Sequence, residues 1–263
     1  MIGAIIGDIV GSRFEFNNIK TKYFDLFAKN SVFTDDTVMT IAVADWFMNA
    51  KNRNSQREAV EFLHKWGRKF PDVGYGSSFV RWLLRNDYLP YNSCGNGAAM
   101  RISPVGFLSK SEDMTKKMSN VITGTTHNHP EGLKGAECTA VMIYRARKGA
   151  SKEELKEYAL SVYPEIADLD YEELRRTYEH NLEICQLTLP QAIYCFLISE
   201  NFEDCLRTTI SIGGDCDTTA AISCAIAEAY YKYIPEDIVR EAKSRLTPEM
   251  LAILEQAENM QDI

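Results

Sequence analysis

The 263-residue sequence predicts an all-α protein that folds as a single compact domain. Apolar residues recur at three- and four-residue intervals along most of the chain, which is the spacing of an amphipathic helix. Sustained alternation of apolar and polar residues, typical of a half-buried strand, is almost absent. Since no Pro/Gly/Ser-rich linker, low-complexity tract or internal repeat divides the chain, we expect residues 1–263 to form one domain.

The expected helices follow one another along the chain. The first carries glycines at four-residue spacing (Gly3, Gly7 and Gly11), and the second, over 35–49, is apolar around most of its circumference, as expected of a core helix. A helix over 217–233 is unusually rich in Ala, Ser and Thr. The remaining helices are expected over 56–69, 129–147, 152–181 with a break near Pro164, 189–199, 202–210, and 235–260 with a break at Pro248.

Small residues on two of these helices indicate that their backbones approach closely. The glycine stripe of the first helix matches the small residues of 217–233, and small faces allow two helices to pack at short range. Such packing would bring the ends of the two helices, and any ligands there, close together. The alternative interpretation is tight packing without a functional role.

Composition limits the classes of function. The net charge of −8 argues against non-specific binding to nucleic acid or anionic membranes. The seven cysteines are an odd number without Cys-x-x-Cys spacing and mostly lie in apolar runs, which is typical of reduced thiols in a cytoplasmic protein. The apolar start, Met1–Asp8, has no basic segment before it and is too short to span a membrane. We therefore expect a soluble cytoplasmic protein.

Two acidic clusters near opposite ends of the chain are the main candidates for chemistry. One is Thr34–Thr37 (Thr-Asp-Asp-Thr), and the other is Gly213–Thr218 (Gly-Gly-Asp-Cys-Asp-Thr). Each begins an expected helix, so helix capping explains either cluster taken alone. Taken together, four aspartates and two threonines would form an all-oxygen ligand set, which suits one or two Mg²⁺ or Mn²⁺ ions better than Zn²⁺ or Cu²⁺.

Two further segments carry polar groups suited to a binding site. Glu15 lies between two phenylalanines, where burial without a partner is unfavourable, and surface pairing with Arg13 is the alternative. The stretch 88–104 is irregular. Its segment Ser93–Arg101 has glycines on both sides of Asn96, a pattern that forms concave anion sites and also simple tight turns. It lacks the lysine of a phosphate-binding P-loop.

Two of the four histidines lie in the segment Thr126–Glu131, at the start of an expected helix. The spacing offers no further ligands for a zinc site. We expect one imidazole to hydrogen-bond a substrate while the other caps the helix or packs. The alternative is a purely structural role.

In this order the motifs resemble the ADP-ribosylglycohydrolase family, whose members include the dinitrogenase reductase-activating glycohydrolase and the ADP-ribosyl-acceptor hydrolases. Each motif is weak alone, but their common order over residues 3–230 makes the resemblance specific. The matching segments are Gly7-Asp8 through Glu15, Thr34–Thr37, Gly95–Gly97 with Met100-Arg101, Thr126-His127 and Gly214–Thr218.

The resemblance implies a fold of orthogonally packed helices and a binuclear Mg²⁺ or Mn²⁺ centre. It implies a mobile glutamate at Glu15, a diphosphate-cradling loop over Ser93–Ala99 that includes Gly95, Asn96 and Gly97, and a ribose-side contact at His127. The residues that match metal-binding positions are Thr34, Asp35, Asp36, Asp215, Asp217 and Thr218.

Family members cleave the bond between the ribose anomeric carbon and an acceptor side chain, usually arginine or serine. The implied partner is an ADP-ribosylated protein or small conjugate, with neither nucleic acid nor membrane. Cleavage of such a bond passes through an oxocarbenium-like state, so a carboxylate such as Asp36 or Glu15 would serve as acid or base. The residues do not decide between these two.

Two features depart from the family pattern. Cys216 lies between the paired aspartates, where we expect it to point into the core, and residues 150–190 match no pattern, which leaves the acceptor open. One alternative function is a catalytically inactive ADP-ribose-binding or structural relative. Another is a phosphoester hydrolase, although the loop supplies no evident nucleophile.

Overall fold

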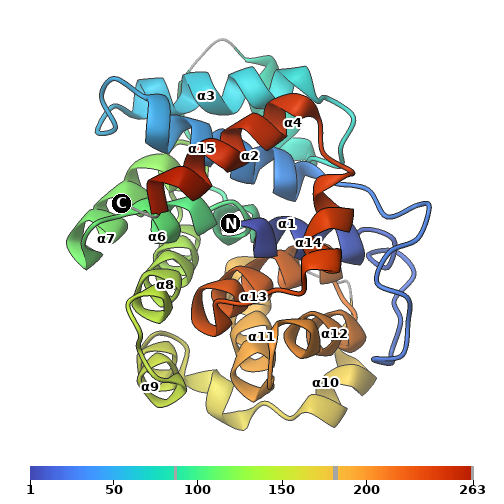
Figure 1. Ribbon diagram of the computed structural model, residues 1–263. Coiled ribbons are helices and arrows are strands. Elements are labelled where there is room, and N and C mark those ends of the chain that lie inside the picture. The colour runs from blue at the N-terminus through green and yellow to red at the C-terminus, as the bar shows by residue number, and fades with distance from the viewer. Residues whose placement is uncertain (86–87, 180–182, 262–263) are drawn as a thin grey trace.

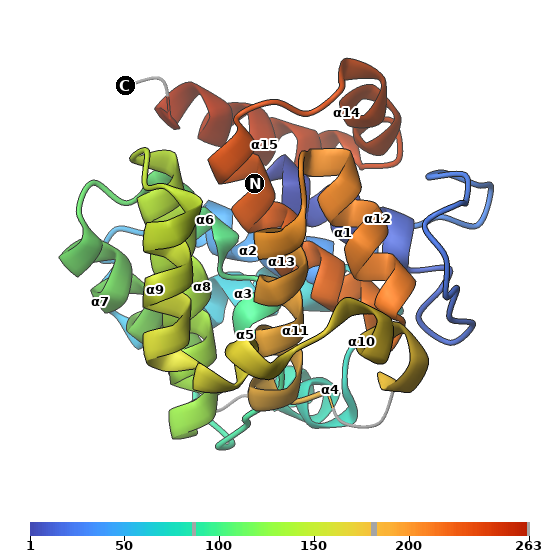
Figure 2. The same ribbon diagram turned by 90° about the horizontal axis from the view of Figure 1, so that it is seen from below.

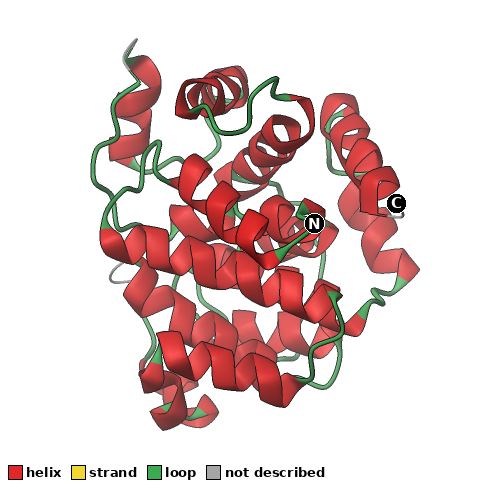
Figure 3. Ribbon diagram, turned by 90° about the vertical axis from the view of Figure 1, so that its left-hand side faces the viewer, coloured by secondary structure: helices red, strands yellow, loops and turns green. Residues whose placement is uncertain are grey.

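The computed structural model describes residues 1–85, 88–179 and 183–261. Within these ranges helices and loops form the whole chain (Figure 3), apart from an isolated antiparallel bridge between Gly95 and Ile184. The helices cross at steep angles: α9 is seen end-on in Figure 1 and lengthwise in Figure 2, whereas α3 runs across Figure 1. The predicted all-α class is confirmed for the described residues.

The helices are labelled in chain order in Figure 1. The first half of the chain contains α1 (Ile2–Gly11), α2 (Asp35–Asn49), α3 (Gln56–Lys69), α4 (Ser77–Leu84), α5 (Gly97–Met100), α6 (Ser103–Leu108) and α7 (Glu112–Thr123). The second half contains α8 (Pro130–Arg147), α9 (Lys152–Val162), the 3₁₀ helix η1 (Pro164–Asp168), α10 (Tyr171–Thr177), α11 (Cys185–Ile198), α12 (Phe202–Ile212), α13 (Cys216–Tyr231), α14 (Glu236–Lys243) and α15 (Pro248–Gln261).

Most of the predicted helices are present. The predictions for α2 and α3 match residue for residue, because side-chain caps start both: Thr34 accepts from the amide of Asp36, and Ser55 from that of Glu58. The helices α8, α12 and α13 have ends one or two residues from the predicted ones. The charged stretch divides at Pro164 into α9, η1 and α10, and its predicted end at 180–181 lies outside the described residues.

Three predictions needed correction. The stretch 88–104 is not wholly irregular, because α5 lies in it and α6 begins at Ser103. Helices α4 and α7 were not predicted from the sequence. Helix α11 begins at Cys185 rather than 189, so that Pro190 lies inside it and not in its first turn. Short helices depend on burial more than on local propensity, and Trp82 of α4 and Ala98 of α5 are both buried.

The helices α1 and α13 form the most extensive helix pair of the fold (Figures 1 and 2). A Cβ atom added to Gly3, Gly7 or Gly11 would lie 2.5, 2.4 or 2.5 Å from atoms of α13. Only glycine permits this approach, since real Cβ atoms do not come within 3.0 Å of such neighbours. The predicted close packing of the two helices is confirmed, and it brings the C-terminal end of α1 beside the N-terminal end of α13.

A hydrophobic core extends from Met1, which precedes α1, to Ala257 in α15. It includes side chains from nearly every helix, as a single domain over residues 1–263 requires, and that division of the chain stays a prediction. A small second cluster joins Leu174, Cys195 and Ile212 beneath α10. Among the described residues, no helix is both long and apolar enough to cross a membrane.

Candidate metal centre and adjoining pocket

A pocket of about 310 Å³ opens beside the ends of α1, α2 and α13. Every residue that the sequence proposed for the site lines this one pocket, although the residues come from five separate parts of the chain. They are Glu15, Thr34, Asp35, Asp36, Ser93, Gly95, Asn96, Gly97, His127, Asp215, Asp217 and Thr218.

Helix geometry explains why the two acidic clusters meet. Thr34–Asp36 form the N-terminal end of α2, and Asp215–Thr218 form that of α13. The amide ends of both helices point toward the pocket, so their dipoles favour negative charge there. The capping interpretation holds for Thr34, whose Oγ1 accepts from the amide of Asp36 at 3.3 Å. The side chain of Asp215 makes no cap bond and remains available for other partners on that helix end.

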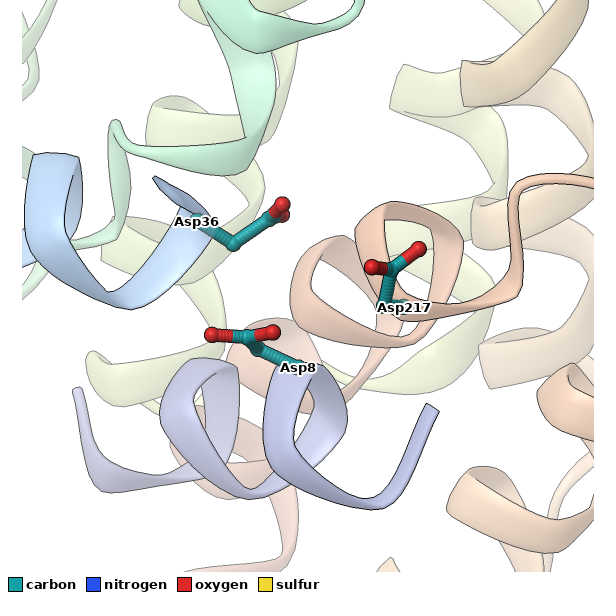
Figure 4. A group of neighbouring side chains, drawn as sticks. All are labelled: Asp8, Asp36 and Asp217. Atoms are coloured by element: carbon teal, nitrogen blue, oxygen red, sulfur yellow. The ribbon is translucent and has the colours of Figure 1, made fainter. Parts of the chain in front are cut away.

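Asp8 of α1 is a part of this centre that the sequence analysis gave no role. Its side chain points from α1 toward Asp36 and Asp217 (Figure 4), and oxygens of the three carboxylates lie within 4.8 Å of one another. The signal that could have found it is a charged residue inside an otherwise apolar helix, since a fully buried aspartate requires partners.

The carboxylate of Asp8 accepts four hydrogen bonds from the first turn of α2. The amide and hydroxyl of Thr34 donate to it at 2.9 and 2.8 Å, the amide of Thr37 donates at 3.0 Å, and the hydroxyl of Thr37 donates to the same oxygen. Burial raises the pKa of Asp8 to about 6, against the lowering effect of these bonds. Asp8 therefore fastens the N-terminal end of α2 to α1.

The carboxylates of Asp36 and Asp217 are buried without a countercharge among the described ion pairs. Burial raises the pKa of Asp36 and of Asp217 well above the usual range, and the neighbouring aspartates raise both further. One oxygen of each, Asp36 Oδ1 and Asp217 Oδ1, is buried without a hydrogen-bond partner in the described part of the chain. Unpaired, mutually repelling carboxylates of this kind need a cation, so the donor set fits hard divalent ions.

A second group of three carboxylates also lines the pocket. Oxygens of Glu15, Asp215 and Asp217 come within 4.8 Å of one another, so Asp217 belongs to both groups. Arg13, the alternative partner considered for Glu15, donates to the carbonyl oxygen of Asp25 and lies over the ring of Phe14. Two groups that share one carboxylate are compatible with two ions.

One further aspartate and one threonine from the acidic clusters line the pocket. Asp35 is half-buried, and burial together with the charges of Asp8 and Asp215 raises its pKa well above the usual range. The hydroxyl of Thr218 donates to Asp36 Oδ2 at 3.2 Å. Cys216 is fully buried with its Sγ toward the carbonyl oxygen of Gly11, which confirms that it points into the core.

The loop before α5 is held by α11 rather than left free. The amide of Asn96 donates to the carbonyl oxygen of Glu183 at 2.9 Å. The side-chain amide of Asn96 donates to Asp215 Oδ2 at 2.6 Å and to Thr188 Oγ1 at 3.1 Å. These bonds use both side-chain N–H groups of Asn96, so they support Asp215 and Thr188. Asn96 also lines the pocket, and its predicted role in substrate binding stays a prediction.

His127 also lines the pocket, beside a second residue whose place in the site was not predicted from the sequence. Arg101 is almost fully buried and lines the pocket, and its Nη2 donates to Thr126 Oγ1 at 2.5 Å. The ring of Tyr91 lies 5.9 Å from that of His127. Burial lowers the pKa of Arg101 to about 10. The motif Met100-Arg101 marked this arginine in the sequence without indicating its task.

The fold and the site together define a class: helical proteins in which converging helix ends hold a buried, oxygen-rich acidic pocket. The chain belongs to the ADP-ribosylglycohydrolase family, whose model matches residues 1–262. ADP-ribosylhydrolase ARH3 from Mus musculus is 28% identical over 312 residues, which cover 90% of this chain and 84% of the relative. ADP-ribosyl-[dinitrogen reductase] glycohydrolase from Rhodospirillum rubrum is 26% identical, covering 88% and 83%.

A solved structure titled ADP-ribosylglycohydrolase-related protein complex has the same fold. It matches with a TM-score of 0.73 over 99% of this chain and 97% of that one, at 24% sequence identity. The resemblance stated from the sequence is confirmed.

Proposed function

We propose that this protein is a metal-dependent hydrolase that releases ADP-ribose from a modified acceptor. The observation that carries the proposal is the pocket in which two buried carboxylate oxygens, on Asp36 and Asp217, have no partner of their own. A cavity of about 310 Å³ lined by these acids and by His127 suits a polar ligand of that size. Membership of the ADP-ribosylglycohydrolase family supports the same activity.

Two divalent ions, Mg²⁺ or Mn²⁺, would be held by residues from the ends of α2 and α13. When bound, such ions supply positive charge that orients the ribose hydroxyls and activates water. The proposed ligands are Thr34, Asp35, Asp36, Asp215, Asp217 and Thr218. The all-oxygen donor set and the absence of a basic partner among the described ion pairs of these residues support this assignment.

Asp36 is the proposed base and Glu15 the proposed acid. Asp36 is buried in the pocket, and one of its oxygens has no hydrogen-bond partner among the described residues, so it could accept a proton from water. Glu15 is half-buried and lines the same pocket, where it could donate a proton toward the departing acceptor. The Glu15→Gln variant tests the acid, because a substrate with an activated leaving group needs no acid and should restore cleavage. Asp36→Asn should stay inactive on that substrate, since it loses both the base and an ion ligand.

The proposed substrate is an ADP-ribosylated protein or a small conjugate, with arginine as the first acceptor to test and serine as the second. The acidic side chains Glu15, Asp35 and Glu183 at the pocket favour a cationic guanidinium beyond the scissile bond. We also propose a cytoplasmic location, since all seven cysteines are free thiols, six of them buried.

The test is mass spectrometry of products from arginine- and serine-ADP-ribosylated peptides, with Mg²⁺ and Mn²⁺ in parallel. We expect release of ADP-ribose that stops on chelation and in Asp217→Asn, whereas the exposed Asp113→Asn variant keeps full activity. No release from any conjugate by the metal-loaded protein would refute the proposal. Tight binding of ADP-ribose without release would instead support the inactive, ADP-ribose-binding alternative.

A further inference from the structure

The imidazole of His127 is held on one side by two donors. Its Nδ1 lies 2.8 Å from Thr126 Oγ1 and 3.4 Å from Arg101 Nη2, and all three side chains are buried. The ring sits at the wall of the pocket, so its other nitrogen is the one that can meet a ligand. The two nitrogens therefore have different surroundings.

The chemistry of these neighbours decides which nitrogen carries the hydrogen. A guanidinium has only donors, so Arg101 cannot accept a hydrogen bond from Nδ1–H. Because Thr126 Oγ1 already accepts from Arg101 Nη2 at 2.5 Å, its own hydrogen is free to be donated onward to Nδ1. A hydrogen on Nδ1 would point toward the guanidinium hydrogens and be repelled. Both neighbours thus favour Nδ1 as an acceptor.

The other nitrogen, Nε2, faces two glycines of the loop before α5. A Cβ atom added to Gly95 or to Gly97 would lie 3.4 Å from Nε2 in either case. Both glycines line the pocket, and no hydrogen bond between Nε2 and another described residue fills this space. The space over the two glycines is thus the place where a ligand oxygen could reach Nε2.

We propose that Arg101 and Thr126 fix His127 in the tautomer with hydrogen on Nε2, which thereby presents a permanent hydrogen-bond donor to a ligand oxygen over Gly95 and Gly97. Arg101 and Thr126 are positioning residues in this arrangement. The identity of the ligand, ADP-ribose, rests on the proposed function, whereas the tautomer does not.

Electrostatics supports the same arrangement. Burial and the charge of Arg101 lower the pKa of His127 well below its usual range, so the ring stays neutral. A neutral imidazole has one donor and one acceptor nitrogen, and the tautomer decides their placement. The described ion pairs do not include Arg101, so its charge is available to act on the ring.

Nitrogen-15 NMR of histidine-labelled protein at pH 7, without ligand or metal, tests the tautomer directly. The His127→Gln variant identifies the signal, since it removes one imidazole of four. We expect Nε2 to be protonated and Nδ1 unprotonated in the native protein. Thr126→Val, which removes the relaying hydroxyl at nearly equal size, is expected to give a mixture of tautomers, and Thr126→Ser to restore the native pattern. Protonation at Nδ1 in the native protein overturns the proposal.

Calorimetric titration with ADP-ribose in the presence of Mg²⁺ gives the second readout. Thr126→Val should weaken binding about fivefold to tenfold, the factor expected from one hydrogen bond, with recovery in Thr126→Ser. An unchanged tautomer together with unchanged affinity in Thr126→Val overturns the proposal. If the native protein binds no ADP-ribose, the proposed function fails, and the NMR signals still decide the tautomer.

Discussion

Substitution of Gly7 by alanine tests whether the contact between α1 and α13 is what shapes the metal centre. The new Cβ would lie 2.4 Å from the carbonyl carbon and oxygen of Ala220 and 2.6 Å from the amide nitrogen of Ala221. All three are backbone atoms of α13, so no side-chain rotation can relieve the overlap. The two helices must move apart.

The size of the effect follows from this distance. Ordinary contact begins at 3.4 Å, so the required separation is 3.4 − 2.4 = 1.0 Å along the line of overlap. Overpacking in a core destabilises by about 1–3 kcal/mol, and a backbone-to-backbone clash belongs at the upper end. The higher helix propensity of alanine offsets about 1 kcal/mol. We expect Gly7→Ala to lower the free energy of unfolding by about 1–2 kcal/mol.

Metal affinity should fall as well, because the two helices carry ligands and their support. Asp8 directly follows Gly7 on α1, and Asp217 lies one turn before Ala220 on α13. Movement of about 1 Å between them opens a group of oxygens now within 4.8 Å of one another. We expect binding of Mn²⁺ to weaken about tenfold or more, comparable with the loss of a supporting residue around a metal site.

Urea unfolding of the chelated protein and calorimetric titration with Mn²⁺ are the two measurements. Gly76→Ala is the matched control for stability, because its φ of −58° suits alanine and the added Cβ meets no atom within 4 Å. The reasoning would be refuted if the Gly7→Ala variant had the same urea midpoint of unfolding as the native protein and bound Mn²⁺ as tightly. That result would mean that the helices rearrange without disturbing the centre.

Three further outcomes are expected. Gly97→Ala should keep the stability of the fold or raise it by about 0.5–1 kcal/mol, because Gly97 begins a helix. It should nevertheless weaken ADP-ribose binding, because the new Cβ would fill the space 3.4 Å from His127 Nε2. Asp36→Asn should raise the stability of the chelated protein by about 1–3 kcal/mol at pH 7, since burial disfavours the charge of Asp36. It should also abolish the further stabilisation that Mg²⁺ gives the native protein. Equal shifts in melting temperature on adding Mg²⁺ to the variant and to the native protein would contradict this. Hydrogen bonding by Arg145 lowers the pKa of Glu112 from 4.5 to about 2, so this group stabilises the fold above pH 4.5 and loses that effect as the pH falls toward 2. Glu112→Gln should therefore lower the free energy of unfolding, measured by urea titration, by about 1 kcal/mol at pH 7. Near pH 2 the variant and the native protein should differ little. The effect is small because the ion pair with Arg145 is partly exposed.

The two acidic clusters were identifiable from the sequence because each contains more carboxylates than a helix cap requires. The residues proposed from them, together with Glu15, the loop before α5 and His127, line one pocket. Spacing alone did not reveal Asp8, whose role depends on which helix end it meets in space. The same holds for Arg101, which becomes part of the site through Thr126 and His127.

The roles of individual side chains were the hardest to predict. Asn96 lies in a glycine-rich loop, as expected, but its amide group supports Asp215 and Thr188, which are distant in sequence. Hydrogen bonds between distant segments depend on the final packing. Short helices such as α4 and α5 also form because neighbouring elements bury them, so local propensity gave no signal for them.

The sequence by itself determined the helical class, the bounds of the longest helices, the close-packing faces and the residue types of the site, because periodicity, caps, glycines and carboxylates act locally. Only the tertiary structure decided which of these groups meet. Glycine at three positions of α1 lets α13 approach to backbone contact, and this brings Asp8, Asp36 and Asp217 to one point (Figure 4). Their burial without a countercharge among the described ion pairs makes them suited to cations. This burial arises only when the segments pack together, so neither segment shows it alone.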